Sequence, residues 1–80
     1  MITLTEAITD VTAEYIRASK IFPPFNSAHE GFAIIAEEYD ELWEEIKKKN
    51  RDPIRMREEA TQLAAMAIRF LVDVPEDVSE

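Results

Sequence analysis

The chain has no cysteine, a single glycine, a single histidine and no apolar run long enough to cross a bilayer. Without cysteine, neither disulfides nor thiolate metal ligands can stabilise so small a domain, and this absence is consistent with a reducing compartment. A membrane span needs about 20 apolar residues, and the N-terminus lacks the basic-then-apolar order of a signal peptide. We therefore expect a soluble, cytoplasmic chain without a membrane partner.

Basic side chains are also scarce, since 9 lysines and arginines stand against 17 aspartates and glutamates, for a net charge of −8. Such a surface argues against nucleic acid as a partner. It suits cations, or anionic ligands that arrive with a cation. A single core of about 80 residues supplies roughly 3–5 kcal/mol of net stability, so oligomerisation is the expected source of further stability.

Prolines and capping residues divide the chain into three helical segments of one domain, residues 1–80. Pro23 and Pro24 end the first segment, because proline has no N–H and disfavours helix at the preceding residue. Ser27, with a glutamate three residues later, is typical of a capping box, and Asp52 followed by Pro53 is typical of a helix start. The expected ranges are helices over about 4–21, 28–49 and 53–72, followed by an acidic tail over 73–80.

Apolar residues recur at helical spacing in all three segments, and no alternation typical of strands appears. The second segment has a seam with steps of four and three: Ala28, Phe32, Ile35, Tyr39, Leu42 and Ile46. The third segment is apolar over most of its girth, which favours contact with a second copy of the chain. We predict an all-α fold, in which a three-helix antiparallel hairpin-type unit assembles into a multi-helix bundle as a homodimer or a dimer of dimers.

The second segment also carries seven carboxylates in the eighteen positions 29–46. At about 100° per residue, Glu37 and Glu41 lie on the middle of its polar face and Glu38 lies at the edge. Because Glu38 and Glu41 are i, i+3 neighbours, their side chains can converge on one point. A solvated acidic face explains most of these carboxylates, whereas a cation site explains only a subset. We interpret Glu44 and Glu45 as solvated surface, with an ion pair between Glu44 and Lys48.

Glu59 in the third segment favours a cation site. By the same rotation it falls inside the apolar arc of its helix, where an unpaired carboxylate is costly. A salt bridge to Arg55, four residues earlier, is one solution. The other is a metal ion shared with Glu38 and Glu41, and carboxylate oxygens without histidine or cysteine suit a hard cation such as Mg²⁺ or Mn²⁺.

The two acidic motifs resemble a known signature. "EEYDE" at 37–41 and "EATQ" at 59–62 are similar to the EExxE…ExxD pattern of the MazG-like, all-α nucleoside triphosphate (NTP) pyrophosphohydrolases. The resemblance covers roughly residues 25–73. It implies a helical-bundle hydrolase that is a dimer or tetramer, binds a nucleotide and depends on magnesium. The implied reaction cleaves the nucleotide between its α and β phosphates, giving a monophosphate and pyrophosphate.

Matched position by position, the metal ligands of that family fall on Glu38, Glu41 and Glu59, and its final aspartate falls on Gln62. Gln62 keeps an oxygen ligand but loses a charge, which would weaken the metal site or remove a base that activates water. Glu37 or Glu41 would orient the attacking water as the catalytic carboxylate.

The resemblance also calls for cationic residues that hold phosphates, and the chain has no fourth helix to carry them. The candidate substrate-binding residues are Lys48, Arg55 and Arg69. Two classes of function remain open. One is a Mg²⁺-dependent nucleotide pyrophosphohydrolase, and the other is a non-catalytic or degenerate helical oligomerisation and interaction module that keeps the fold.

Overall fold

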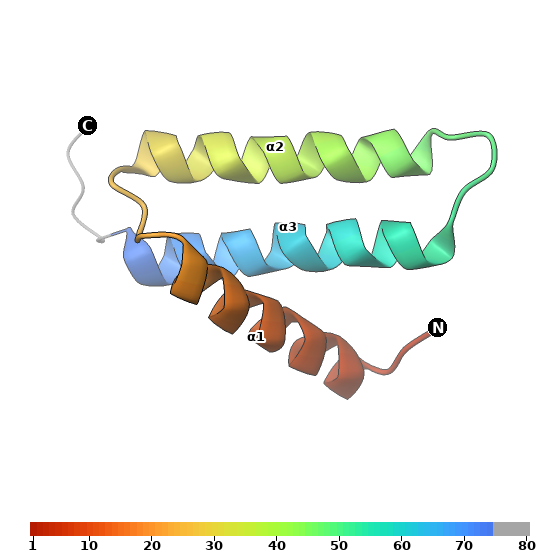
Figure 1. The fold of residues 1–80 in the computed structure, drawn as a ribbon, viewed down its shortest axis with the longest axis horizontal. Coiled ribbons are helices and arrows are strands. Elements are labelled where there is room, and N and C mark those ends of the chain that lie inside the picture. Colours follow the sequence, from red (N-terminus) through yellow and green to blue (C-terminus); the bar gives the residue numbers. More distant parts are fainter. Residues whose placement is uncertain (75–80) are drawn as a thin grey trace.

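The computed structural model describes residues 1–74, which form three α-helices and no strand (Figure 1). The helices are α1 (Leu4–Ile21), α2 (Ala28–Ile46) and α3 (Pro53–Asp73). α2 and α3 lie side by side as an antiparallel hairpin, and α1 crosses α3 obliquely and packs on α3 but not on α2. The all-α prediction is therefore confirmed, and assembly into a larger bundle stays a prediction. Across residues 1–74, no helix combines the length and the apolar character that a membrane span requires.

Each helix begins at a side-chain cap. The Thr3 hydroxyl starts α1, in the range expected from the sequence, as part of a reciprocal capping box. The Ser27 hydroxyl accepts a hydrogen bond from the Glu30 N–H at 3.0 Å at the start of α2. The Glu30 carboxylate accepts from the backbone and the side-chain amide of Asn26. Asp52 caps α3 in the same manner, so the three starts are determined by local hydrogen bonds.

α2 ends at Ile46, three residues earlier than the range of 28–49 expected from the sequence. Arg51 Nε donates a hydrogen bond of 2.7 Å to the Ile46 carbonyl. In a longer helix that carbonyl would accept from the N–H of Asn50, four residues on. The arginine therefore takes the place of the Asn50 N–H at this carbonyl, and the lysines at 47–49 lie outside α2.

The buried core lies where α1, α3 and the connection between α1 and α2 meet. Among the described residues, its buried apolar side chains are few: Ala18, Phe25, Ala65 and Met66. Gly31 lets α2 approach α3 closely, because a Cβ atom at this position would lie 2.7 Å from Phe70 Cδ2 and 3.0 Å from Phe25 Cδ2. The contact between α2 and α3 therefore depends on the absence of a side chain at position 31.

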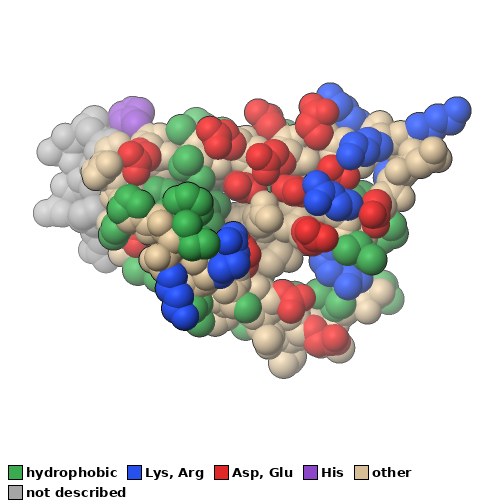
Figure 2. All heavy atoms as spheres, viewed as in Figure 1, with side chains coloured by type: hydrophobic (Ala, Val, Ile, Leu, Met, Phe, Trp, Pro, Cys, Tyr) green, Lys and Arg blue, Asp and Glu red, His purple; other side chains and the backbone are tan. Residues whose placement is uncertain are grey.

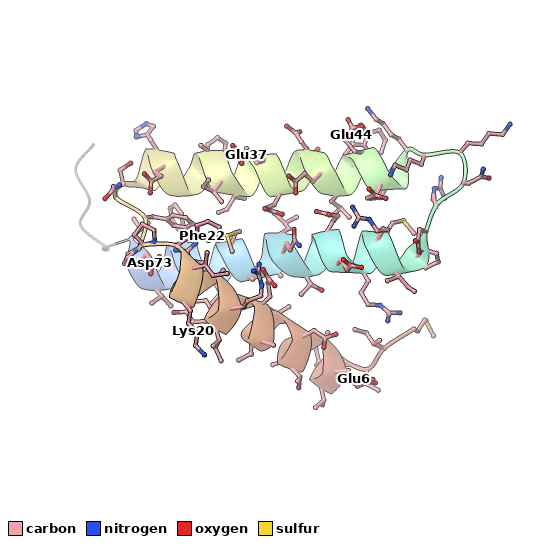
Figure 3. The ribbon with its side chains drawn as sticks, in the orientation of Figure 1. Glu6, Lys20, Phe22, Glu37, Glu44 and Asp73 are labelled. Carbon is pink, nitrogen blue, oxygen red and sulfur yellow. The ribbon has the colours of Figure 1, made fainter. Side chains whose placement is uncertain are left out.

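The last turn of α3 holds the connection between α1 and α2. Arg69 is 3% exposed, and its Nη2 donates a hydrogen bond of 2.8 Å to the Pro23 carbonyl. Its guanidinium lies over the Phe25 ring, 4.7 Å from the centroid. Asp73 accepts from the Phe25 N–H and lies at the end of α3 beside this connection (Figure 3). Asp73 thus belongs to α3, which corrects its placement in the acidic tail; residues 75–80 of that tail lie outside the described residues.

The apolar seam expected for α2 is partly exposed in the single chain. Phe32 and Tyr39 are 67% and 64% exposed, whereas Gly31 and Glu45 are the buried residues of α2. The hairpin therefore turns a partly acidic side of α2 toward α3 and leaves the two aromatic residues of the apolar seam, Phe32 and Tyr39, exposed.

Candidate functional site

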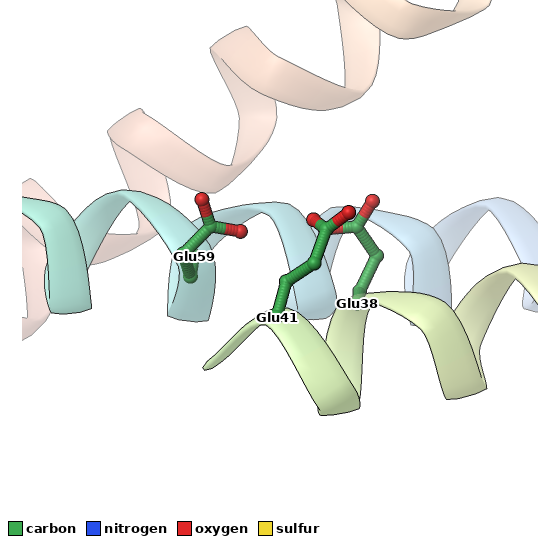
Figure 4. A group of neighbouring side chains, drawn as sticks. All are labelled: Glu38, Glu41 and Glu59. Atoms are coloured by element: carbon green, nitrogen blue, oxygen red, sulfur yellow. The ribbon is translucent and has the colours of Figure 1, made fainter. Parts of the chain in front are cut away.

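Three carboxylates from two helices converge between α2 and α3. Glu38 and Glu41 extend from consecutive turns of α2, and Glu59 extends from α3 toward the same space (Figure 4). One oxygen of each side chain lies within 4.8 Å of the other two. The antiparallel hairpin thus brings together three of the four residues that the two sequence motifs predict as metal ligands. The fourth, Gln62, lines the groove beside them but does not belong to the cluster.

Two of these carboxylates have an oxygen without a hydrogen-bond partner. Glu59 is 8% exposed and Glu38 is partly buried, and the Oε2 atom of each is both buried and unpaired. Glu41 is exposed at the mouth of the cluster. Burying a carboxylate oxygen without a partner is unfavourable, so the cluster favours either protonation or a bound cation.

The pKa values of Glu38 and Glu59 also indicate that the cluster favours protonation or a bound cation. Burial raises the pKa of Glu38 to about 7, and the charges of Glu41 and Glu59 add to this shift. Burial also raises the pKa of Glu59, followed by its interaction with Glu41, whereas the positive charge of Arg55 acts in the opposite direction. The three carboxylates therefore resist being ionised together unless positive charge enters the site.

Arg55 supplies part of that charge. Its Nη2 atom lies 3.8 Å from Glu59 Oε1 and 3.7 Å from Glu45 Oε2, and its Nη1 atom lies 4.0 Å from Glu58. These distances are long for ion pairs, and the arginine side chain is half exposed, so each interaction is weak. The salt bridge expected for Glu59 is present, yet it leaves the second oxygen of Glu59 without a partner.

The interpretation of Glu45 as solvated surface is wrong. Glu45 is 7% exposed, and its Oε2 atom accepts a hydrogen bond of 2.9 Å from Lys48. The predicted pair of Glu44 with Lys48 is also wrong, because Glu44 pairs with Lys47 on the outer side of α2 (Figure 3). Glu45 follows Glu38 by seven residues, two turns along the same side of the helix, and this spacing was the signal for its burial.

A groove of about 640 Å³ opens beside the cluster, between α2, α3 and α1. Acidic side chains gather on this face of the molecule (Figure 2). The charged and amide residues that line the groove come from all three helices: Glu14, Arg17, Glu30, Glu37, Glu38, Glu41, Gln62 and Arg69. Sequence reasoning missed Glu14 and Arg17, because only the packing of α1 on α3 brings them to the groove. Arg17 forms a bidentate pair with Glu14, at 2.9 and 2.6 Å.

The three basic residues predicted to bind substrate have other contacts. Arg69 lines the groove, but its guanidinium also holds Pro23 and pairs with Asp73 at 3.7 Å. Lys48 and Arg55 pair with Glu45 and do not line the groove. Their roles in substrate binding stay predictions.

Within residues 1–74, the fold and the site define an all-α unit of three helices with a carboxylate cluster between two antiparallel helices. A scan against protein-family models finds no match, and searches of curated proteins and of solved structures give none either. The likeness to the MazG-like family therefore rests on the two acidic motifs and on their spacing.

Proposed function

We propose that the protein is a Mg²⁺- or Mn²⁺-dependent nucleotide pyrophosphohydrolase that acts in the cytoplasm as a homodimer or tetramer. The observation that supports this proposal best is the convergence of Glu38, Glu41 and Glu59 within 4.8 Å, with two buried oxygens left unpaired. The resemblance of the two motifs to the MazG-like signature supplies the class of reaction.

The residues present fit a hard divalent cation. Glu38, Glu41 and Glu59 would hold it through carboxylate oxygens, with the amide oxygen of Gln62 as a neutral fourth donor on the same groove. The ion would neutralise phosphate charge and lower the pKa of bound water. Its charge would also offset the repulsion that raises the pKa values of Glu38 and Glu59.

The proposed reaction is the hydrolysis of a nucleoside triphosphate at its α phosphorus. The oxygen of a water molecule forms a bond to that phosphorus, and the bond to the bridging oxygen of the β phosphate breaks. The products are a nucleoside monophosphate and pyrophosphate. Glu37 lines the groove beside the cluster, and it or Glu41 accepts the proton of the water and orients the water for in-line attack.

Binding the polyphosphate in an acidic groove needs positive charge from the protein as well. Arg17 lines the groove, and its side chain is 56% exposed, so it can turn from Glu14 toward a phosphate. Arg69 contributes a fixed positive charge at the inner wall of the groove.

A panel of ribo- and deoxyribonucleoside triphosphates with Mg²⁺, assayed for pyrophosphate, tests this function. We expect turnover of at least one nucleotide, its loss on removal of divalent ions, and a decrease of at least about 100-fold in Glu41→Gln. Glu44→Gln is the matched control, because Glu44 lies on the same helix, pairs with Lys47 and does not line the groove.

Thermal unfolding with Mg²⁺ or Mn²⁺ provides the accompanying measurement of binding. Both ions should raise the melting temperature of the unmodified chain and of Glu44→Gln, but not of Glu41→Gln. If no nucleotide is turned over and no divalent ion binds, the catalytic proposal is wrong.

A non-catalytic helical interaction module is the second candidate, and Gln62 is the observation that favours it. An amide at this position lowers the negative charge of the second motif, whereas the resemblance calls for an acid there. In that case the chain would bind a nucleotide or a protein without hydrolysis. The same panel distinguishes the two candidates, because a module that binds a nucleotide produces no pyrophosphate.

A further inference from the structure

An ion pair of α1 lies beside the carboxylate groove. Both oxygens of the Glu14 carboxylate accept hydrogen bonds from Arg17, at 2.9 Å from Nε and 2.6 Å from Nη2. The two side chains differ in exposure, since that of Glu14 is 16% exposed and that of Arg17 is 56% exposed. The carboxylate is therefore the sheltered member of the pair, and the guanidinium is the member that a ligand from solvent reaches first.

Glu14 lies close to the carboxylate cluster. A second pocket, of about 350 Å³, lies between α1 and α3, and Glu14, Arg17 and Gln62 line both this pocket and the groove. These three residues therefore lie where the two hollows meet. Burial is the main cause of the raised pKa of Glu38, and the charge of Glu14 is among the smaller causes, so Glu14 acts electrostatically on the cluster.

The cluster has an amide beside it on the side next to α1. Gln62 follows Glu59 by three residues on α3, and it lines the groove together with Glu38 and Glu14. An amide oxygen adds no charge to a site for a hard cation, whereas a carboxylate oxygen does. The side chain of Glu59 is only 10% exposed and extends into the cluster with its Oε2 atom unpaired, which indicates a ligand there.

We propose that Glu14 is a fourth carboxylate of the cation site, which Arg17 occupies until a phosphate of the nucleotide draws the guanidinium away; this role rests on the proposed function. When Arg17 turns to a phosphate, both oxygens of Glu14 lose their hydrogen-bond donors. A sheltered carboxylate without a partner is unfavourable. Glu14 then regains a partner by contributing an oxygen to the cation that the cluster holds.

The exchange of partners couples the binding of nucleotide and cation. The three carboxylates of the cluster come from α2 and α3, so release of Glu14 adds a negative charge from the third helix. Because the coupling free energy between two ligands is reciprocal, the nucleotide strengthens cation binding and the cation strengthens nucleotide binding. The pair on α1 thus keeps the affinity for the cation low until the substrate arrives.

Cation binding without a nucleotide tests this exchange, because a substitution can release Glu14 in place of a phosphate. Electron paramagnetic resonance at pH 8 measures free Mn²⁺, since the hydrated ion gives a sharp signal that is lost on binding. We expect Arg17→Met to bind Mn²⁺ about tenfold more tightly than the unmodified chain. The double variant Arg17→Met/Glu14→Gln should lose this gain.

Arg57→Met is the matched control for the change in net charge. Arg57 is exposed and lines the pocket between α1 and α3, but it does not line the groove. Its removal lowers the net charge by the same amount as Arg17→Met without releasing Glu14. An equal gain in affinity in the two single variants would overturn the proposed role of Glu14.

The double variant Arg17→Met/Glu14→Asp separates direct binding of the cation from the general attraction of a negative charge. Aspartate keeps the charge but is one methylene shorter, so a ligand role predicts loss of most of the tenfold gain. Persistence of the gain with aspartate or glutamine at position 14 would overturn the role. Thermal unfolding checks that each variant is folded, and if a double variant is not, the comparison of Arg17→Met with Arg57→Met still decides.

The titrations also distinguish this role from the proposed activity. If neither the unmodified chain nor Arg17→Met binds Mn²⁺, the proposed cation site is wrong, and the role of Glu14 is wrong with it. If the unmodified chain binds Mn²⁺ and Arg17→Met binds it no more tightly, only the role of Glu14 is wrong, and the proposed hydrolysis is unaffected.

Discussion

Glu38, Glu41 and Glu59 show how the position of a side chain decides its chemistry. All three are glutamates, yet Glu41 is exposed, whereas Glu38 and Glu59 each keep a buried, unpaired oxygen. Burial and mutual repulsion raise the pKa of Glu38 to about 7, so a cation that enters the cluster competes with a proton. The convergence of these three side chains therefore indicates a candidate cation site more specifically than the acidic composition of α2 does.

Position 62 offers a test at the scale of one residue. Gln62→Asp adds a fourth carboxylate to the groove and restores the acid that the MazG-like signature contains. We expect Mg²⁺ to bind about tenfold more tightly, because affinity for hard cations rises with the number of charged ligands. Isothermal titration calorimetry measures this change, and Gln62→Asn serves as the neutral control. Equal affinity in both variants would mean that residue 62 is not a ligand.

At the scale of the elements, the three helices follow from local signals. Thr3, Ser27 and Asp52 cap the helix starts, and Pro23 and Pro24 prevent α1 from continuing. The end of α2 was harder to predict, because the Ile46 carbonyl accepts a side-chain hydrogen bond from Arg51 that no sequence rule specifies. The predicted helix was therefore three residues too long.

The contact between α2 and α3 gives a prediction at this scale. Gly31→Ala improves the intrinsic helix propensity of α2 by up to about 1 kcal/mol. Its Cβ atom would nevertheless meet Phe70 Cδ2 at 2.7 Å and force the ring to move. Since overpacking costs about 1–3 kcal/mol, we expect a net loss of about 1 kcal/mol in the free energy of unfolding, measured by urea denaturation.

The control for this substitution is Ala33→Gly at an exposed position of the same helix, where propensity alone should cost about 1 kcal/mol. A Gly31→Ala variant more stable than the unmodified chain would show that α2 and α3 do not require the glycine.

At the scale of the whole molecule, the raised pKa of Glu38 makes stability depend on pH. The folded protein retains a proton up to about pH 7, whereas the unfolded chain releases it near the usual value of 4.5. The metal-free protein should therefore lose stability as the pH rises from about 4.5 to 7, and change little through this group above that range. Urea denaturation in the presence of a chelator, at fixed protein concentration, measures this slope.

Glu38→Gln is the informative variant for the pH dependence. It removes the titrating carboxyl, so it should reduce the slope and stabilise the metal-free protein at pH 8. Mg²⁺ should stabilise the unmodified chain increasingly across the same pH range, and this effect should be absent in the variant. An unmodified, metal-free protein that gains stability between pH 5 and 7 would contradict the assignment.

The sequence alone determined the features that depend on near neighbours. Helical periodicity and caps specified the three helices, and the i, i+3 spacing specified that the side chains of Glu38 and Glu41 lie close together. Rotation around α3 placed Glu59 on the side that meets α2, where it lies. These inferences succeeded because the geometry within a helix is the same wherever the helix packs.

Only the tertiary structure decided which side of each helix is covered. The apolar pattern of α2 placed Phe32 and Tyr39 in one seam without deciding what covers it, and in the single chain they are exposed whereas Glu45 is buried. The packing of α1 on α3 brought Glu14 and Arg17 to the groove, although their sequence carries no motif. Packing between helices depends on the joint fit of distant side chains, such as Gly31 beside Phe70, and no local spacing contains that information.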